Sequence, residues 1–319
     1  MEGITLLVLI FALQISVAIA ADSLNINQTL TFNQTLVSSN QTFQLGFFTP
    51  TNSNNNNNNN RWYLGIWFNK IQTRTVIWVA NRDNPLSNPS SGALKINSNG
   101  LLTLSNETNH IIWSSSLNTT NRVNSPVFAL LLDNGNLVIK SQISTNDDSN
   151  GYVWQSFDYP SDNLIEGMKF GWNLKTGLNR KLQSWKSSDD PSNGDFVYEI
   201  VPNGFPEPIL RNGSVKLFRA GPWTGIQYSG TPELTNNPVF QPSFVFSNEE
   251  VYYSFKSTDG SVISRFLVDS TGSLYRLSWN SRSLQWVVMI NVLKDNATSM
   301  AFVEFMVLAT LMWLCFASA

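Results

Sequence analysis

The chain has 319 residues and a net charge of −2, and only 13% of its residues are charged. Its 42% hydrophobic content is enough to build a core, which excludes wholesale disorder. No patch of Lys and Arg stands out in the sequence, which disfavours nucleic-acid binding. One Cys and one His leave few ways to build a metal site or a nucleophile–base pair, so we expect no metal, no cofactor and no enzymatic activity.

Residues 1–20 look like a secretory signal peptide. An apolar run begins at Ile4 and ends at Ala18-Ile19-Ala20, the small-x-small pattern of a signal-peptidase site. The residues before the run contain no Lys or Arg, which departs from the usual pattern. An N-terminal membrane anchor is the alternative, but the run is short for one. The pattern therefore predicts a secreted or extracellular protein.

Short apolar runs punctuated by Gly, Asn, Asp and Pro dominate the middle of the chain, and sustained 3.6-residue spacing does not occur. The tetrapeptide Asp133-Asn134-Gly135-Asn136 separates two such runs, and Asn-Gly readily takes positive φ, so it predicts a hairpin turn. Polar stretches at 54–60 and 146–151 are expected to be exposed loops, and the second is the best place for a domain boundary. These features, together with 11 Trp, predict an all-β fold.

A weak internal repeat supports this fold class. Each copy has a glycine turn, a strand with alternating apolar positions, a polar loop and a second strand that ends in Trp. The turn glycine and the Trp of the copies are Gly100 and Trp113, Gly135 and Trp154, and Gly272 and Trp286. Repeated hairpins of this kind predict a barrel or prism whose Trp side chains fill a shared axis.

Residues 300–319 form a hydrophobic C-terminal tail. Its clean apolar part, residues 305–319, is shorter than the ~20 residues that span a bilayer comfortably, and no Lys or Arg follows it. The small residues at 296–299 loosely fit a lipid-anchor signal. The sequence leaves three interpretations open: a membrane anchor, a processing signal, or a foreign end left by truncation.

Asn-x-Ser/Thr sequons are frequent, which is compatible with glycosylation of an extracellular protein. They also match what chance gives in a chain this rich in Asn, Ser and Thr, so they are weak support for secretion. The candidate glycosylation sites are Asn27, Asn33, Asn40, Asn106, Asn118, Asn212 and Asn296.

Six segments in order carry a family resemblance. They are Tyr-Leu-Gly-Ile-Trp-Phe at 63–68 with Val-Ile-Trp-Val-Ala-Asn-Arg-Asp-Asn-Pro-Leu at 76–86, Leu-Leu-Asp-Asn-Gly-Asn-Leu-Val at 131–138, Trp-Gln-Ser-Phe-Asp-Tyr-Pro-Ser-Asp at 154–162, Ser-Trp-Lys-Ser-Ser-Asp-Asp-Pro at 184–191, and Arg-Ala-Gly-Pro-Trp-Thr-Gly at 219–225. The chain thus resembles the ectodomains of plant bulb-type (G-type) lectin S-receptor-like kinases and S-locus glycoproteins, over roughly residues 22–294.

The resemblance implies two tandem bulb-lectin-like β-prism domains. Residues 22–150 would form the bulb-type lectin domain, and residues 151–294 a second lectin-like S-locus glycoprotein region. The match ends before the family's Cys-rich EGF/PAN region and kinase, so the resemblance implies no kinase activity for this chain.

The family's mannose site follows the pattern Gln-x-Asp-x-Asn-x-Val-x-Tyr. The matching positions here are Leu132, Asn134, Asn136, Val138 and Lys140, of which only Asn136 and Val138 keep the family residue. The three replacements remove most of the directional hydrogen-bonding groups, each worth ~1 kcal/mol, so we expect sugar binding at this degenerate site to be weak or absent.

The Trp side chains at 67, 78, 113 and 154 are expected in the core, and Trp223, within Gly-Pro-Trp, is the better guess for an exposed platform. The favoured function is a non-catalytic extracellular recognition protein. Its partner would be a peptide or protein ligand, or a related receptor-kinase ectodomain, in pollen recognition or defence signalling. The alternatives are a mannose-binding lectin, an incomplete product that folds poorly and, least supported, a secreted hydrolase.

Overall fold

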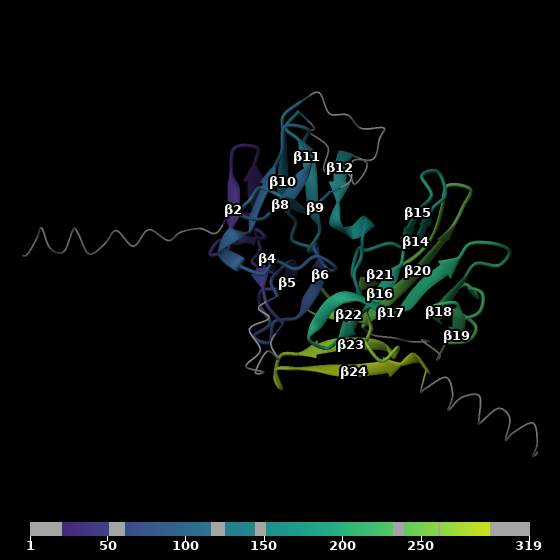
Figure 1. The fold of residues 1–319 in the computed structure, drawn as a ribbon. Coiled ribbons are helices and arrows are strands. Elements are labelled where there is room, and N and C mark those ends of the chain that lie inside the picture. The colour runs from purple at the N-terminus through teal and green to yellow at the C-terminus, as the bar shows by residue number, and fades with distance from the viewer. Residues whose placement is uncertain are drawn as a thin grey trace, which may run out of the picture.

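The computed structural model describes residues 21–50, 61–115, 125–143, 151–231, 239–260 and 262–293, and it is built almost entirely of β-strands (Figure 1). Within these ranges the strands form six four-stranded sheets. Three sheets use strands that precede residue 156 and are called the first prism, and three use strands that follow residue 162 and are called the second prism. The all-β class and the two tandem prisms predicted from sequence are confirmed.

The first prism has one strand from the N-terminal segment in each of its sheets. One sheet has the order β3 (Leu36–Val37), β4 (Phe43–Phe48), β5 (Tyr63–Phe68) and β6 (Val76–Val79). The next has the order β2 (Thr29–Thr31), β7 (Ala93–Ile96), β8 (Leu102–Ser105) and β9 (Ile111–Ser114). The third has the order β1 (Ser23–Asn25), β10 (Val127–Leu131), β11 (Leu137–Ser141) and β12 (Tyr152–Gln155).

The strand β12 follows the 146–151 stretch at which the sequence suggested a domain boundary, and it pairs antiparallel with β11 of the first prism. The short 3-10 helix η3 (Ser156–Asp158) then leads towards the second prism. Another 3-10 turn, η1 (Pro89–Ser91), precedes β7. The domain limits themselves stay a prediction.

The second prism repeats the arrangement of three sheets. One sheet has the order β15 (Leu178–Arg180), β14 (Phe170–Asn173), β21 (Glu250–Ser257) and β20 (Phe240–Phe246). The next runs β16 (Leu182–Ser187), β17 (Asp190–Val201), β18 (Glu207–Asn212) and β19 (Val215–Arg219). The last has the order β13 (Asn163–Ile165), β22 (Ser264–Val268), β23 (Leu274–Asn280) and β24 (Gln285–Asn291).

The glycine turns of the repeat form as predicted. Gly100, Gly135 and Gly272 have φ of +77°, +88° and +84°, a region that favours glycine. The predicted Asn-Gly hairpin joins β10 to β11, and the Gly135 N–H donates to the carbonyl of Leu132 at 2.9 Å. The same local chemistry therefore starts a strand at equivalent places in both prisms.

Trp side chains close one end of the first-prism axis. Trp78, Trp113 and Trp154 meet edge to face, with ring centroids 5.8 to 6.1 Å apart. Trp78 and Trp154 are buried and Trp113 is half-buried, so the predicted shared axis is present in this prism. Trp286 of the third copy behaves differently, because it packs against Trp279 and against Phe68 of the first prism.

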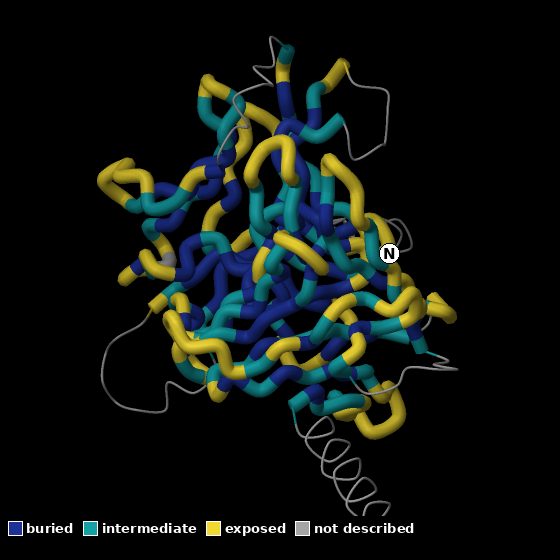
Figure 2. The backbone as a smooth tube through the Cα atoms, turned by 90° about the vertical axis from the view of Figure 1, so that its right-hand side faces the viewer, coloured by how far each residue is buried: buried dark blue, intermediate teal, exposed yellow. Residues whose placement is uncertain are grey.

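The two prisms share one continuous set of buried apolar residues. The buried backbone segments, dark blue in Figure 2, gather at the centre of the molecule. Arg82 carries much of the polar contact between the prisms and is only 9% exposed. Its Nε donates to the carbonyl of Pro191 at 2.7 Å, and its Nη2 donates to the carbonyls of Ser184 (2.7 Å) and Gln183 (3.1 Å). These contacts fix the second prism against the loop that follows β6.

Candidate functional site

The predicted sugar residues lie on β11 and the turn before it. Asn134 is exposed in the turn, and its Oδ1 accepts from the N–H of Asn136 at 3.0 Å. Asn136 is only 3% exposed. Its Nδ2 donates to Oε1 of Gln155 at 2.9 Å, and its Oδ1 accepts from Ser156 Oγ at 3.1 Å and Phe157 N at 3.2 Å. Both ends of this amide are therefore engaged inside the protein.

The next two positions of the pattern are also buried. Val138 is fully buried and Lys140 nearly so. The ammonium of Lys140 lies 6.0 Å from the ring centroid of Tyr152 on the neighbouring strand. A sugar could reach these side chains only after local rearrangement. Carbohydrate binding at Asn134, Asn136, Val138 and Lys140 stays a prediction.

The candidate glycosylation sites are distributed over both prisms. Asn27, Asn33, Asn40 and Asn212 are exposed, and Asn106 is half-buried, with its Oδ1 accepting from the N–H groups of Thr108 and His110. Asn118 and Asn296 lie outside the described residues. Occupancy of these sequons stays a prediction.

A cleft of about 430 Å³ lies between the prisms, and we call it the inter-prism cleft. The first prism contributes the end of β6 with the loop after it, part of β9 and the Trp of β12. The connecting segment and strands β15 to β17 contribute the rest. Its lining residues are Trp78 to Asn84, Ile112 to Ser115, Trp154, Asp158 to Ser161, Asn179, Lys181, Gln183 and Asn193.

The two walls of this cleft differ in chemistry. Trp154 and Tyr159 stack with ring centroids 6.0 Å apart and an interplanar angle of 13°, beside the half-buried Trp113. The part of the cleft that the second prism lines is polar and contains Asn179 and Lys181. No pattern in the sequence marks this site, because its residues come from segments that only the packing of the prisms brings together.

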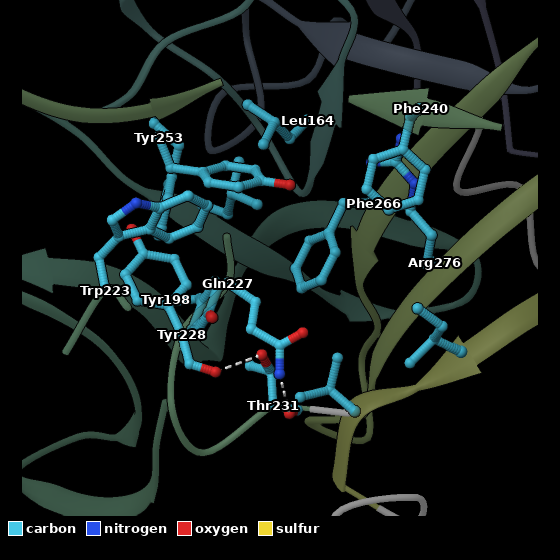
Figure 3. Close-up of a pocket in the computed structure, with 14 residues that line it drawn as sticks. Leu164, Tyr198, Trp223, Gln227, Tyr228, Thr231, Phe240, Tyr253, Phe266 and Arg276 are labelled. Carbon is cyan, nitrogen blue, oxygen red and sulfur yellow. Dashed lines mark hydrogen bonds between the residues drawn. The ribbon is translucent and has the colours of Figure 1, made fainter. Parts of the chain in front are cut away.

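A second, smaller cavity of about 80 Å³ lies inside the second prism (Figure 3). Its wall is aromatic and aliphatic, and the hydroxyl of Tyr253 points into it in Figure 3. Burial raises the pKa of Tyr198, Tyr228 and Tyr253, so all three hydroxyls stay protonated at neutral pH. Burial also lowers the pKa of the Arg276 guanidinium, which also lines the cavity, to about 10.

Trp223 does not stand free on the surface. Its half-buried ring packs on Tyr228, Phe244 and Tyr253, with centroids 5.2 to 6.3 Å apart, and it lines this cavity. Trp223 therefore forms part of the wall of this cavity and does not offer an open platform on the surface.

Large apolar side chains reach solvent on the outer strands of the second prism. β24 forms one edge of its sheet, and Val287, Val288 and Met289 on it are 42%, 52% and 47% exposed. β19 forms an edge of another sheet, and Val215 and Leu217 on it are also exposed. Exposed apolar edges of this kind often mark protein contact surfaces.

Within the described part of the chain, no helix is long and apolar enough to cross a membrane. The segments 1–20 and 300–319, for which the sequence suggested a signal peptide and a hydrophobic tail, lie outside the described residues.

Comparisons with known proteins match this arrangement. Residues 75–186 match the D-mannose binding lectin family, and residues 218–300 match the S-locus glycoprotein domain. The S-locus-specific glycoprotein S6 of Brassica oleracea is 46% identical over 269 residues, which are 84% of this chain and 58% of that protein. The receptor-like serine/threonine-protein kinase SD1-8 of Arabidopsis thaliana is 45% identical over 271 residues, which are 84% of this chain and 31% of that protein.

Among solved structures, the two-domain, fetuin-binding agglutinin of Scilla campanulata aligns with 78% of this chain and 90% of its own, at 14% identity and a TM-score of 0.26. The chain spans less than two thirds of the length of the relatives named above. The two domain matches and these relatives confirm the resemblance found in the motifs: the chain carries a bulb-type lectin domain followed by an S-locus glycoprotein domain, and it is related to the S-locus glycoproteins and the G-type lectin receptor kinases.

Proposed function

We propose that the chain is a non-catalytic extracellular recognition protein that binds a peptide or protein ligand, or the ectodomain of a related receptor. The observation that carries the proposal is the row Val287, Val288 and Met289 on the edge strand β24. An edge strand offers unpaired backbone groups, and exposed apolar side chains beside them add area that a protein partner can bury. By contrast, both ends of the Asn136 amide are already bonded within the protein.

Other apolar side chains of the second prism are also exposed. Leu284 lies at the turn before β24, and Ile226, which is 60% exposed, lies in the loop after β19. A partner that covers several such side chains gains about 25 cal/mol for each Å² of apolar area removed from water. Pollen recognition and defence signalling are the roles that we propose for such an interaction, because the relatives include S-locus glycoproteins and receptor kinases.

The test is a binding assay of the full secreted chain against a panel of related receptor ectodomains and small secreted peptides. We expect at least one member to bind, and Val288→Lys to weaken that binding at least tenfold by placing a charge in the contact. Ile111→Lys is the matched control, because Ile111 is 55% exposed and lies on β9 of the first prism. No binding to any member, or equal losses in both variants, would contradict the proposal.

The extracellular location has its own test. Asn27, Asn33, Asn40 and Asn212 are exposed enough for an oligosaccharyltransferase to reach them after translocation. The intact mass of the mature protein from its native tissue should show loss of residues 1–20 and one or more N-glycans. A mass equal to that of the unmodified full chain would refute secretion. The same measurement reports whether residues 300–319 are retained.

Mannose binding is the second candidate function. It is favoured by the match of residues 75–186 to the D-mannose binding lectin family and by the retained Asn136 and Val138. A glycan array decides it: α-mannose binding that is lost in Asn136→Ala would establish this function for strand β11.

A further inference from the structure

The inter-prism cleft differs in position and chemistry from the degenerate mannose strand. Its volume of about 430 Å³ falls within the roughly 300–1,000 Å³ typical of small-molecule sites, which often form at domain interfaces. Both prisms line it, so its shape depends on the contacts that hold the prisms together. Arg82, whose guanidinium bonds to three carbonyls of the second prism, also lines the cleft and fixes its floor.

One wall offers aromatic surface. Tyr159 is half-buried and stacks on Trp154, and Trp113 stands half-buried beside them with its ring centroid 5.8 Å from that of Trp154. The indole of Trp78 is held in place because its Nε1 donates to the Tyr159 carbonyl at 2.9 Å. The wall is therefore preorganised to bury an apolar face of a ligand without the entropy cost of ordering long flexible side chains.

The second-prism side of the cleft offers polar groups. Asn179 donates from Nδ2 to Oε2 of Glu199 at 3.0 Å, which leaves its Oδ1 buried and without a hydrogen-bond partner among the described residues. Asn193 is fixed by its N–H and its Nδ2, which both donate to the carboxylate of Asp83. Lys181 is exposed at this wall and adds a flexible donor. A buried acceptor that lacks a partner is costly, and a ligand hydroxyl would remove that cost once a small rotation of the Asn179 amide opens this shielded oxygen to the cleft.

The charges in the cleft argue against an anionic ligand. Arg82 and Lys181 are balanced by Asp83 and Asp158. Arg82 is occupied by backbone carbonyls, and Asp158 accepts from Arg180 Nε at 2.6 Å. What remains is the exposed Lys181 ammonium, balanced within the cleft by carboxylates, together with neutral amide groups and an aromatic face. This pattern suits a ligand with an apolar face and a rim of hydroxyl groups.

We propose that the inter-prism cleft binds a neutral carbohydrate, with the apolar face of one sugar ring against Trp113 and Tyr159 and its hydroxyls on Asn179 and Lys181. The site is separate from strand β11 and goes beyond the protein-recognition function proposed above. Because the aromatic wall belongs to the first prism and its connecting segment and the amide wall to the second, a bound sugar bridges the two prisms.

The proposal is tested by isothermal titration of the full chain with methyl α-mannoside, methyl β-glucoside and neutral tetrasaccharides of glucose, mannose, galactose and xylose. The protein carries Asn118→Gln, so that a glycan on this sequon, three residues after the cleft residue Ser115, cannot compete. We expect at least one saccharide to bind. Trp113→Ala and the double variant Asn179→Ala/Lys181→Ala should each weaken that binding tenfold or more.

Two controls keep the outcome interpretable. Trp113 also packs in the Trp cluster, so the double variant, which replaces polar side chains only, carries the test if Trp113→Ala fails to fold. Lys216→Ala, at an exposed position on β19 outside the cleft lining, should leave binding unchanged. Absence of binding by every saccharide at millimolar concentration overturns the proposal. Saccharide binding that survives both cleft variants also overturns it.

The protein panel separates this inference from the proposed function. The double variant should bind its protein or peptide partner as tightly as the parent chain does, because the cleft and strand β24 use different residues. If the double variant loses the protein partner and no saccharide binds, the cleft belongs to the protein interface and the carbohydrate proposal is wrong. If saccharides bind, the cleft variants weaken that binding and no protein binds, the function proposed above fails while the carbohydrate site stands.

Discussion

The ion pair between Arg61 and Asp190, at the contact between the prisms, shows how an individual residue contributes to the stability of the fold. Asp190 is 9% exposed, and its Oδ2 lies 2.7 Å from Nη1 of Arg61. Its Oδ1 accepts from the N–H of Ser192 at 3.1 Å and from its hydroxyl at 2.7 Å. Burial works to raise the pKa of Asp190, but the hydrogen bonds from Ser192 and the charge of Arg61 outweigh it and leave the pKa below 3.8.

Replacing this carboxylate should therefore have a pH-dependent effect. A carboxyl group whose pKa is lower in the folded state than in the unfolded chain stabilises the fold at pH values above its ordinary pKa of 3.8. That stabilisation is lost as the pH falls through the lower, folded-state pKa. We expect Asp190→Asn to cost roughly 1 kcal/mol at pH 7, a modest value because Arg61 is half exposed to solvent. Urea unfolding from pH 7 to pH 2.5 should show this cost shrinking towards zero.

The exposed Asp195 provides the comparison for this experiment. Asp195→Asn should change the unfolding free energy little at any of these pH values. A cost for Asp190→Asn that stays constant down to pH 2.5 would show that the charge of this carboxylate does not stabilise the fold.

Turns are the elements on which the repeat depends, and Gly135 is one whose turn is also restricted by packing. Its φ is +88°, and a Cβ added there would lie 2.9 Å from Cε1 of the buried Phe43. Gly177, in the turn between β14 and β15, also has positive φ, +73°, but has open space around it. Both glycines therefore need a positive φ, but only Gly135 is also closely packed against a neighbouring side chain.

Alanine at these two positions separates the two effects. Gly177→Ala should cost about 1 kcal/mol, from the left-handed backbone alone. Gly135→Ala should cost about 2–4 kcal/mol, because overpacking against Phe43 adds ~1–3 kcal/mol. Denaturant unfolding of both variants measures the difference. Equal costs would mean that Phe43 can move aside and that packing does not restrict the turn.

The elements also show where the sequence was informative. The Asn-Gly turn and the strands on both sides of it were predictable because the φ of Gly135 and the short apolar runs that flank it are local properties. The N-terminal strands were not, since β1, β2 and β3 have only two or three residues each, and each joins a different sheet. Pairing such as that of Leu24 with Ala129 is decided by tertiary closure of the prism, which no window of the sequence contains.

The candidate sites, too, were predictable from sequence only where local residues define them, and not where tertiary packing does. The strand with Asn136 was found from a residue pattern, but the pattern could not reveal that Gln155, Ser156 and Phe157 use both ends of its amide. The inter-prism cleft had no sequence signal, because Trp113 and Asn179 are brought to it from different prisms. Function at the scale of the whole molecule therefore depends on how the two prisms are held together.

Arg82 is the residue whose removal should uncouple them. Burial lowers the pKa of its guanidinium, and the nearby carboxylates of Asp162 and Asp83 oppose that effect. Asp162 is itself buried, and desolvation raises its pKa while Arg82 and Arg265 favour its charged form. Arg82→Met would leave carbonyls of the second prism without their hydrogen-bond donor. It would also remove a positive charge that stabilises the buried Asp162 carboxylate.

We expect Arg82→Met to lower the unfolding free energy by about 3–5 kcal/mol, the usual result of removing one partner from a buried charged network. Because those bonds join the prisms, calorimetry should show one transition in the parent chain and two in the variant, with the less stable prism melting first. Arg282→Met, at an exposed position in the turn before β24, is the matched control and should keep a single transition. A single transition in Arg82→Met would mean that the shared apolar core alone couples the prisms. In that case the cleft would keep its shape in this variant, and its affinity for saccharides should be unchanged.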